Sequence, residues 1–181
     1  MASEPTRAQS VERFEFGAQF TAMRLSGIDA TDAGIGARVS WNVSDALTLE
    51  AVSDFFPAGR DNVVRGGRKL DALFGLKEGW RGARAGAFVK TRAGIARLSE
   101  GRAAFGVCVL IFPPPQSCYA GETRLAFDLG GVLEIYPSRR STVRLDAGDL
   151  ATRLTSSSSG FGRRGDFAHD FQVGAGVGVR F

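Results

Sequence analysis

The sequence predicts an all-β fold made of eight antiparallel strands. Apolar residues alternate with polar or small residues in eight separate segments of about 9–13 residues, and this period of two is typical of strands. The pattern is clearest in FQVGAGVGVRF, which runs from Phe171 to the final residue, Phe181. The predicted strands are residues 13–23, 33–43, 47–55, 69–77, 83–97, 124–136, 142–150 and 171–181.

The composition is that of a single domain in which His and Met are scarce. The chain has 181 residues, and it carries one histidine and a net charge of +4 that is spread along the strands. This distribution predicts no nucleic-acid partner. We expect residues 1–10 to be a flexible N-terminal segment and residues 11–181 to be one domain. The first residues lack the basic and apolar regions of a signal peptide, so we expect either a cytosolic protein or a mature form restarted with Met.

The lengths of the connections between the predicted strands limit the number of possible architectures. No apolar run reaches the roughly 18 residues of a membrane-spanning helix. The second, fourth and sixth connections are tight turns near Ser44, Glu78 and Pro137, whereas the other four are longer. Alternating short turns and long loops are typical of an outer-membrane β-barrel. The sequence therefore predicts an up-and-down transmembrane β-barrel with short periplasmic turns, long extracellular loops and both termini in the periplasm.

In such a barrel, one face of each strand contacts lipid and the other faces the lumen. A sheet in lipid must close so that its backbone groups are paired, and the apolar face points outward. The polar face lines a narrow lumen, where buried charges require partners. We expect a paired network there, with the inward glycines leaving room for long side chains. Its predicted members are Arg13, Glu15, Arg38, Glu50, Asp54, Asp71, Lys77, Arg84, Lys90, Arg92, Asp128, Glu134, Arg144, Asp146 and Arg180.

Aromatic residues lie beside the short turns. Trp41 and Trp80 adjoin the first two turns, Tyr136 adjoins the third, and Phe181 ends the chain on the same side. Membrane barrels place aromatic side chains at the lipid–water interface. We therefore expect these four residues to form one interfacial ring at the periplasmic side.

The closing stretch FQVGAGVGVRF and the segment LFGLKEGWRGARAGAFVKTRAGIAR carry a family resemblance. From about Val11 to Phe181 the chain resembles the small eight-stranded outer-membrane barrels of the OmpA-like and opacity-like group. The resemblance implies a monomer in the outer membrane of a Gram-negative bacterium, in contact with outer-membrane lipids. It also implies that the barrel-assembly machinery recognises the C-terminal strand through Phe181. In contrast to the larger members of the group, we expect no peptidoglycan-binding domain after the barrel.

Two cysteines lie in the fifth connection. Cys108 and Cys118 lie close together in one Gly/Pro-rich segment without a neighbouring histidine, so zinc binding is not expected. A disulfide that closes a short loop in an oxidising compartment is the preferred interpretation, and two free thiols are the alternative.

We predict a structural or surface-display role, with no catalytic residue, metal or cofactor, and with any extracellular partner bound by the loops. The apolar CVLIFPPPQSC stretch and the RGD tripeptide at Arg164 are candidate contacts. Three alternatives stay open. One is a lipid A-modifying enzyme using His169, although Phe171 occupies the position where that family has serine. The others are a narrow ion-conducting pore and a soluble lipocalin-like barrel with an apolar interior.

Overall fold

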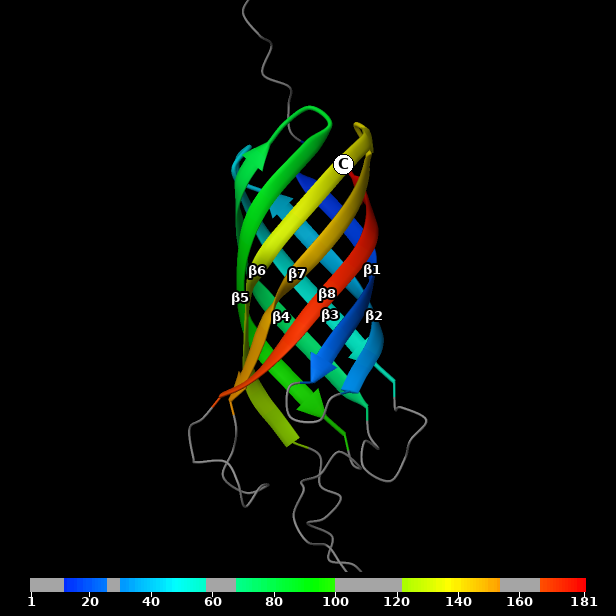
Figure 1. Ribbon diagram of the computed structural model, residues 1–181. Helices are drawn as coiled ribbons and strands as arrows, with labels where there is room; N and C mark the ends of the chain where they lie inside the picture. Colours follow the sequence, from blue (N-terminus) through cyan, green and yellow to red (C-terminus); the bar gives the residue numbers. More distant parts are fainter. Residues whose placement is uncertain (1–11, 26–29, 58–67, 100–121, 154–166) are drawn as a thin grey trace, which may run out of the picture.

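The protein is a closed antiparallel barrel in which every strand pairs with its neighbours in chain order and β8 pairs with β1 (Figure 1). The computed structural model describes residues 12–25, 30–57, 68–99, 122–153 and 167–181. The strands are β1 (Phe14–Leu25), β2 (Ala30–Asn42), β3 (Leu47–Phe56), β4 (Lys69–Arg81), β5 (Ala85–Leu98), β6 (Glu122–Ser138), β7 (Ser141–Arg153) and β8 (Phe167–Arg180). The predicted eight-stranded up-and-down barrel is confirmed.

The two ends of the barrel differ in their connections. Three turns, at residues 43–46, 82–84 and 139–140, lie at the end where β1 begins and β8 finishes, which we call the turn end. The opposite, loop end joins the strands through residues 26–29, 57–68, 99–121 and 154–166. The first of these connections is much shorter than predicted, because β2 already begins at Ala30.

The terminal residue takes part in closing the barrel. The backbone N–H of Phe181 donates to the carbonyl of Phe14 over 2.9 Å, and the N–H of Phe14 donates to the carbonyl of Phe181 over 3.2 Å. The final phenylalanine therefore completes the ladder between the last strand and the first.

Several strands are longer than the alternation predicts. β4 continues to Arg81, which pairs with Gly86, and β8 begins at Phe167, which pairs with Arg153. In both places the backbone ladder continues past the point where apolar and polar residues cease to alternate cleanly. Side-chain patterning therefore ends before the hydrogen-bonded strand does.

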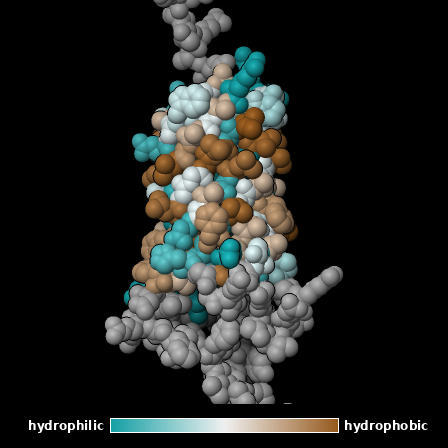
Figure 2. Space-filling model, in the orientation of Figure 1, coloured by the Kyte–Doolittle hydropathy of each residue, from teal (hydrophilic) through white to brown (hydrophobic). Residues whose placement is uncertain are grey.

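The faces are arranged as predicted for a barrel with an apolar exterior. Outward-facing side chains such as Phe74 (60% exposed) and Leu129 (62%) are open to the surroundings, whereas Arg38 (1%) is buried in the interior. Apolar side chains cover the middle of the face seen in Figure 2. The lipocalin-like alternative is wrong, because it requires these apolar residues inside. Among the described residues, no helix is long and apolar enough to cross a bilayer.

Candidate functional site: the charged lumen

The barrel interior holds most of the charged residues that the alternation assigned to it. Thirteen of the predicted residues have side chains that are exposed by 9% or less. The predicted members found inside are Glu15, Arg38, Glu50, Asp54, Asp71, Lys77, Lys90, Arg92, Asp128, Glu134, Arg144, Asp146 and Arg180.

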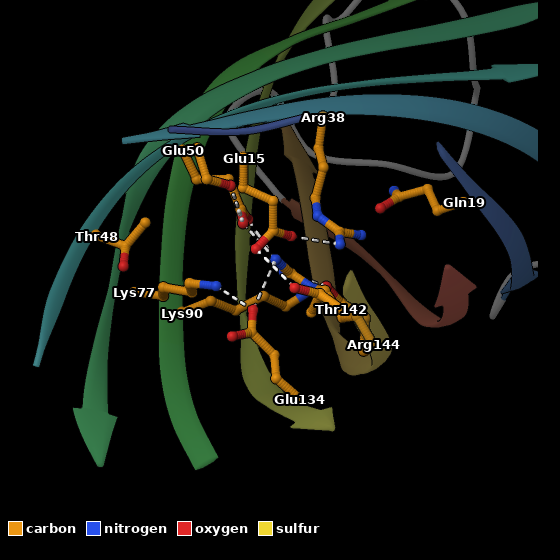
Figure 3. Close-up of polar contacts among 12 residues, drawn as sticks. Glu15, Gln19, Arg38, Thr48, Glu50, Lys77, Lys90, Glu134, Thr142 and Arg144 are labelled. Carbon is orange, nitrogen blue, oxygen red and sulfur yellow. Dashed lines mark hydrogen bonds and ion pairs between the residues drawn. The ribbon is translucent and has the colours of Figure 1, made fainter. Parts of the chain in front are cut away.

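Arg144 on β7 is the centre of the network. Its guanidinium donates to both carboxylate oxygens of Glu50, and the contact from Nη2 to Oε1 measures 3.0 Å. The same Nη2 donates to Asp146 Oδ2 over 2.6 Å. Two-point contacts of this kind fix the orientation of the carboxylate as well as its charge. Figure 3 shows Arg144 and Glu50 approaching each other from opposite walls of the lumen.

Asp146 connects this pair to a second group of charges. Lys90 contacts Asp146 and also lies 3.0 Å from Asp128 Oδ2. Arg92 binds the same two carboxylates, with Nε 3.0 Å from Asp128 Oδ2 and Nη2 3.1 Å from Asp146 Oδ2. Each carboxylate therefore has more than one cationic neighbour, and the ion pairs form one connected network across the barrel.

Nearer the turn end, the network meets aromatic rings. Lys77 pairs with Glu134, and its Nζ lies 4.9 Å from the centre of the Phe88 ring. The hydroxyl of Tyr136 donates to Glu134 Oε2 over 2.8 Å, and the Arg180 guanidinium lies 3.8 Å from the centre of the Tyr136 ring. Tyr136 is thus buried in the lumen. Its predicted place in the interfacial ring is wrong, because it shares the inward face of β6 with Glu134.

Glu15 closes the network between the first and last strands. It accepts from Arg38 over 2.7 Å, from Arg180 over 3.2 Å and from the Thr142 hydroxyl over 3.1 Å. Glycine makes room for Arg38: a Cβ added at Gly17 would lie 2.8 Å from its Cζ. The inward glycine therefore leaves the space that the arginine occupies.

Toward the loop end, apolar side chains share the lumen with buried polar and charged ones. Asp54 accepts from Gln19 and Thr21, each over 2.8 Å, and Lys69 pairs with Asp71 over 3.0 Å. Around these residues lies a buried cluster that we call the apolar plug, made of Met23, Phe56, Leu73, Ala96, Ala126 and Leu150. The Nζ of Lys69 lies 3.1 Å from Met23 Sδ within it. The plug was not predicted from the sequence. Its signal was the apolar residues on the polar face of the strands, such as Met23 and Leu73.

Two predicted members of the network lie elsewhere. Arg13 precedes β1 and Arg84 lies in the turn between β4 and β5, and both side chains are exposed at the turn end. The prediction that both residues lie in the lumen is wrong. Both positions are beyond the barrel rim, where a residue on the inward side of the alternation is no longer surrounded by strands.

The other three residues of the predicted aromatic ring face outward at the turn end. Trp41 (47% exposed), Trp80 (64%) and Phe181 (64%) lie on the outer surface. Phe14 stacks on Trp41 with ring centres 6.5 Å apart, and Phe16 meets Phe181 edge to face at 6.1 Å. The exposed aromatics at this end therefore include two residues of β1 that the prediction did not contain.

The network consists mainly of salt bridges, and Asp54 accepts hydrogen bonds from the neutral side chains of Gln19 and Thr21. Within the described strands, no group of three or more His, Cys, Asp or Glu side chains is arranged to hold a metal ion. His169 Nδ1 lies 2.6 Å from Asp149 Oδ2, but this pair is exposed on the outer surface near the loop end. The predicted disulfide partners, Cys108 and Cys118, lie outside the described residues.

Solved structures resemble the barrel along nearly its whole length. The N-terminal β-barrel domain of Pseudomonas aeruginosa OprF matches with a TM-score of 0.55 and 11% identity, over 92% of this chain and 97% of that one. Neisserial surface protein A matches with a TM-score of 0.57 and 14% identity, over 93% and 97%. The Yersinia pestis attachment invasion locus protein Ail, in complex with the heparin analogue sucrose octasulfate, gives 0.56 and 12%, over 93% and 97%.

The chain has the fold of the small eight-stranded outer-membrane barrels. No family model matches the sequence, and no curated protein gives a significant match. With identities of 11–14%, the likeness to solved outer-membrane barrels is one of fold. Nearly full coverage of both chains in each comparison means that the whole barrel is matched rather than one hairpin.

Proposed function

We propose that this protein is an integral barrel of the bacterial outer membrane with a structural or surface-display role. Its lumen is filled by the charged network and the apolar plug, so the barrel serves as a rigid support and the connections at the loop end meet external partners. Loops on a rigid scaffold are the usual carriers of binding function. In this proposal the loop end is extracellular, both termini are periplasmic, and the barrel works as a monomer without a cofactor.

One observation carries the proposal. The outward-facing ionisable residues of the eight described strands are Arg24, Glu78, Arg97, Asp149, Arg153 and His169, and all of them lie near one end of the barrel or the other. Between these rims the outer face presents apolar, small or hydroxyl side chains, while the charges are buried inside. Charged residues on the lipid face of a membrane barrel cost about 2–4 kcal/mol at mid-depth. A water-facing surface carries no such restriction.

The experiment is refolding with and without detergent, followed by electrophoresis of heated and unheated samples. The proposal expects a folded monomer only when detergent or lipid is present, and an unheated band that migrates differently from the boiled one. A monodisperse folded protein in detergent-free buffer would contradict the proposal, because the apolar outer face would then tolerate water.

A second experiment addresses assembly through the C-terminal strand. Phe181→Ser keeps the backbone ladder to Phe14 but removes the terminal aromatic ring. We expect less protein to reach the outer membrane in cells, with refolding in detergent unchanged. Phe127→Ser, another exposed aromatic on the outer face, is the matched control. Equal losses for the two variants would argue against a specific signal in Phe181.

A further inference from the structure

Four exposed arginines lie at the turn end, outside the charged lumen. They are Arg13 before β1, Arg84 in the turn between β4 and β5, and Arg139 and Arg140 in the turn between β6 and β7. Within the described part of the chain, none of these four guanidiniums forms a salt bridge. Their charges take no part in closing the lumen and are open to a partner outside the barrel.

Backbone hydrogen bonds connect the three segments that carry these arginines. The carbonyl of Arg84 accepts from the N–H of Tyr136 over 2.8 Å, and the carbonyl of Arg140 accepts from the N–H of Arg180 over 2.8 Å. The pairing of β8 with β1 then brings the last strand next to Arg13. The four arginines, which we call the basic arc, therefore follow one part of the rim from the β4–β5 turn round to β1. At about 4.8 Å per strand, the arc is roughly 20 Å long.

The rest of the rim carries the opposite charge. The acidic side chains described at this end are Glu12, next to the arc, and Asp45 and Glu78. Asp45 lies in the turn between β2 and β3, and the backbone N–H of Gly79, which follows Glu78, donates to the carbonyl of Ala46 in that turn over 3.0 Å. The turn end is thus basic along the arc and acidic on the β2–β4 side.

This mixed pattern identifies the kind of partner. A single small anion is too short to bridge the three segments of the arc. A uniformly anionic polymer or lipid surface would also bring negative charge to Asp45 and Glu78, where like charges repel. A polypeptide can place carboxylates against the arginines, which bind them through paired hydrogen bonds, and basic side chains against the acidic side. About six extended residues are long enough to follow the arc.

We propose that the turn end docks a polypeptide segment in which a run of acidic residues covers the basic arc and basic residues face Asp45. This surface is separate from the loop end, to which the proposed function assigns the external partners. The location of the partner in the periplasm rests on the proposed membrane function. Recognition is electrostatic, because the closed barrel offers no free strand edge for an added strand.

The experiment measures the binding of labelled peptides to the refolded full-length barrel in phosphatidylcholine nanodiscs by fluorescence anisotropy. One peptide has six glutamates, and the other has the same six glutamates followed by four lysines. The test variant removes one arginine from each segment of the arc and carries Arg13→Gln, Arg84→Gln and Arg140→Gln. The matched control removes the same charge from exposed positions at the loop end and carries Arg68→Gln, Arg97→Gln and Arg153→Gln. Electrophoretic mobility of unheated samples verifies that each variant is folded.

The natural protein and the control should bind the mixed peptide more tightly than the glutamate peptide. The test variant should bind either peptide about ten-fold more weakly than the natural protein, because three arginine–carboxylate contacts are lost. Asp45→Asn should remove most of the gain that the lysines give.

Equal binding by the natural protein and the test variant would overturn the proposal. Equal losses in the test and control variants would do the same, because binding would then follow net charge. Tighter binding of the all-glutamate peptide by the natural protein would also overturn it, because a uniformly basic surface suits an anionic lipid or nucleic acid. Folding of the barrel without detergent would instead refute the membrane function, since peptide binding does not depend on what surrounds the outer face.

Discussion

The two parts of the barrel interior are closed by different kinds of interaction. Around Arg144, buried ions compensate one another through several contacts per carboxylate. At the loop end, Met23, Phe56 and Leu150 fill the same kind of space by apolar packing, and each is fully buried. Removing one ion leaves its partners uncompensated, whereas removing a methyl group leaves only a cavity. The charged part should therefore respond cooperatively to substitution and the plug locally.

The largest expected effect is in the charged part. Arg144→Met leaves Glu50 and Asp146 without their closest guanidinium and should lower the free energy of unfolding by about 3–5 kcal/mol. Urea denaturation in lipid vesicles, followed by tryptophan fluorescence, measures the change. Adding Glu50→Gln should recover part of the loss, because the uncompensated carboxylate is removed. Arg140→Met, at an exposed turn position, is the control. An additive double variant would mean that the two side chains are not coupled.

In the plug, Leu150→Ala should lower the free energy of unfolding by about 2–5 kcal/mol, through lost burial and the cavity left behind. The more conservative Leu150→Met should cost less than about 1.5 kcal/mol, since it roughly conserves volume. The same denaturation experiment separates the two. Combined with Arg144→Met, the Leu150→Ala loss should be nearly additive. Strong coupling between Leu150 and Arg144 would show that the interior behaves as one unit, and would contradict the expectation that the plug responds locally.

A smaller effect is expected where glycine makes room for the network. Gly17→Ala would put a Cβ 2.8 Å from Arg38 Cζ and 2.9 Å from the carbonyl oxygen of Val177. The resulting strain should cost about 1–3 kcal/mol. Gly131→Ala is the matched control, because the nearest atom to its added Cβ is 4.0 Å away. Equal stabilities of the two variants would mean that Arg38 moves aside freely and that the glycine is not needed for space.

The fold could be predicted because a barrel repeats one rule eight times. Residues two apart share a face, so the alternation through FQVGAGVGVRF placed Val173 outside and Gln172 inside without any tertiary information. Connection lengths then supplied the order of the strands. The first connection was misjudged because Thr31 and Asp32 interrupt the apolar pattern, although the ladder between β1 and β2 already includes both.

The site was harder to predict where it departs from that rule. Alternation identifies which residues face the lumen, but it does not say which carboxylate Arg144 binds, because the partners come from distant strands. It also failed at the rims. Arg13 and Arg84 are at positions that the alternation assigns to the inward face, but both side chains are exposed to solvent beyond the end of the barrel wall. Tyr136 lies near a turn, but it is an even number of residues from Glu134 on β6 and therefore shares the inward face with that residue. The plug was missed because apolar residues on an inward face break the expected pattern.

The central claim is that hydrocarbon surrounds the apolar outer face. Its most direct test places one tryptophan at Leu129, which is 62% exposed on the outside of β6, in a variant with Trp41→Phe and Trp80→Phe. The protein is refolded into vesicles whose acyl chains carry bromine near the bilayer centre. We expect strong quenching of this tryptophan by the brominated lipids and weak quenching by acrylamide dissolved in the water. Strong quenching by acrylamide, with none by the brominated lipids, would contradict it.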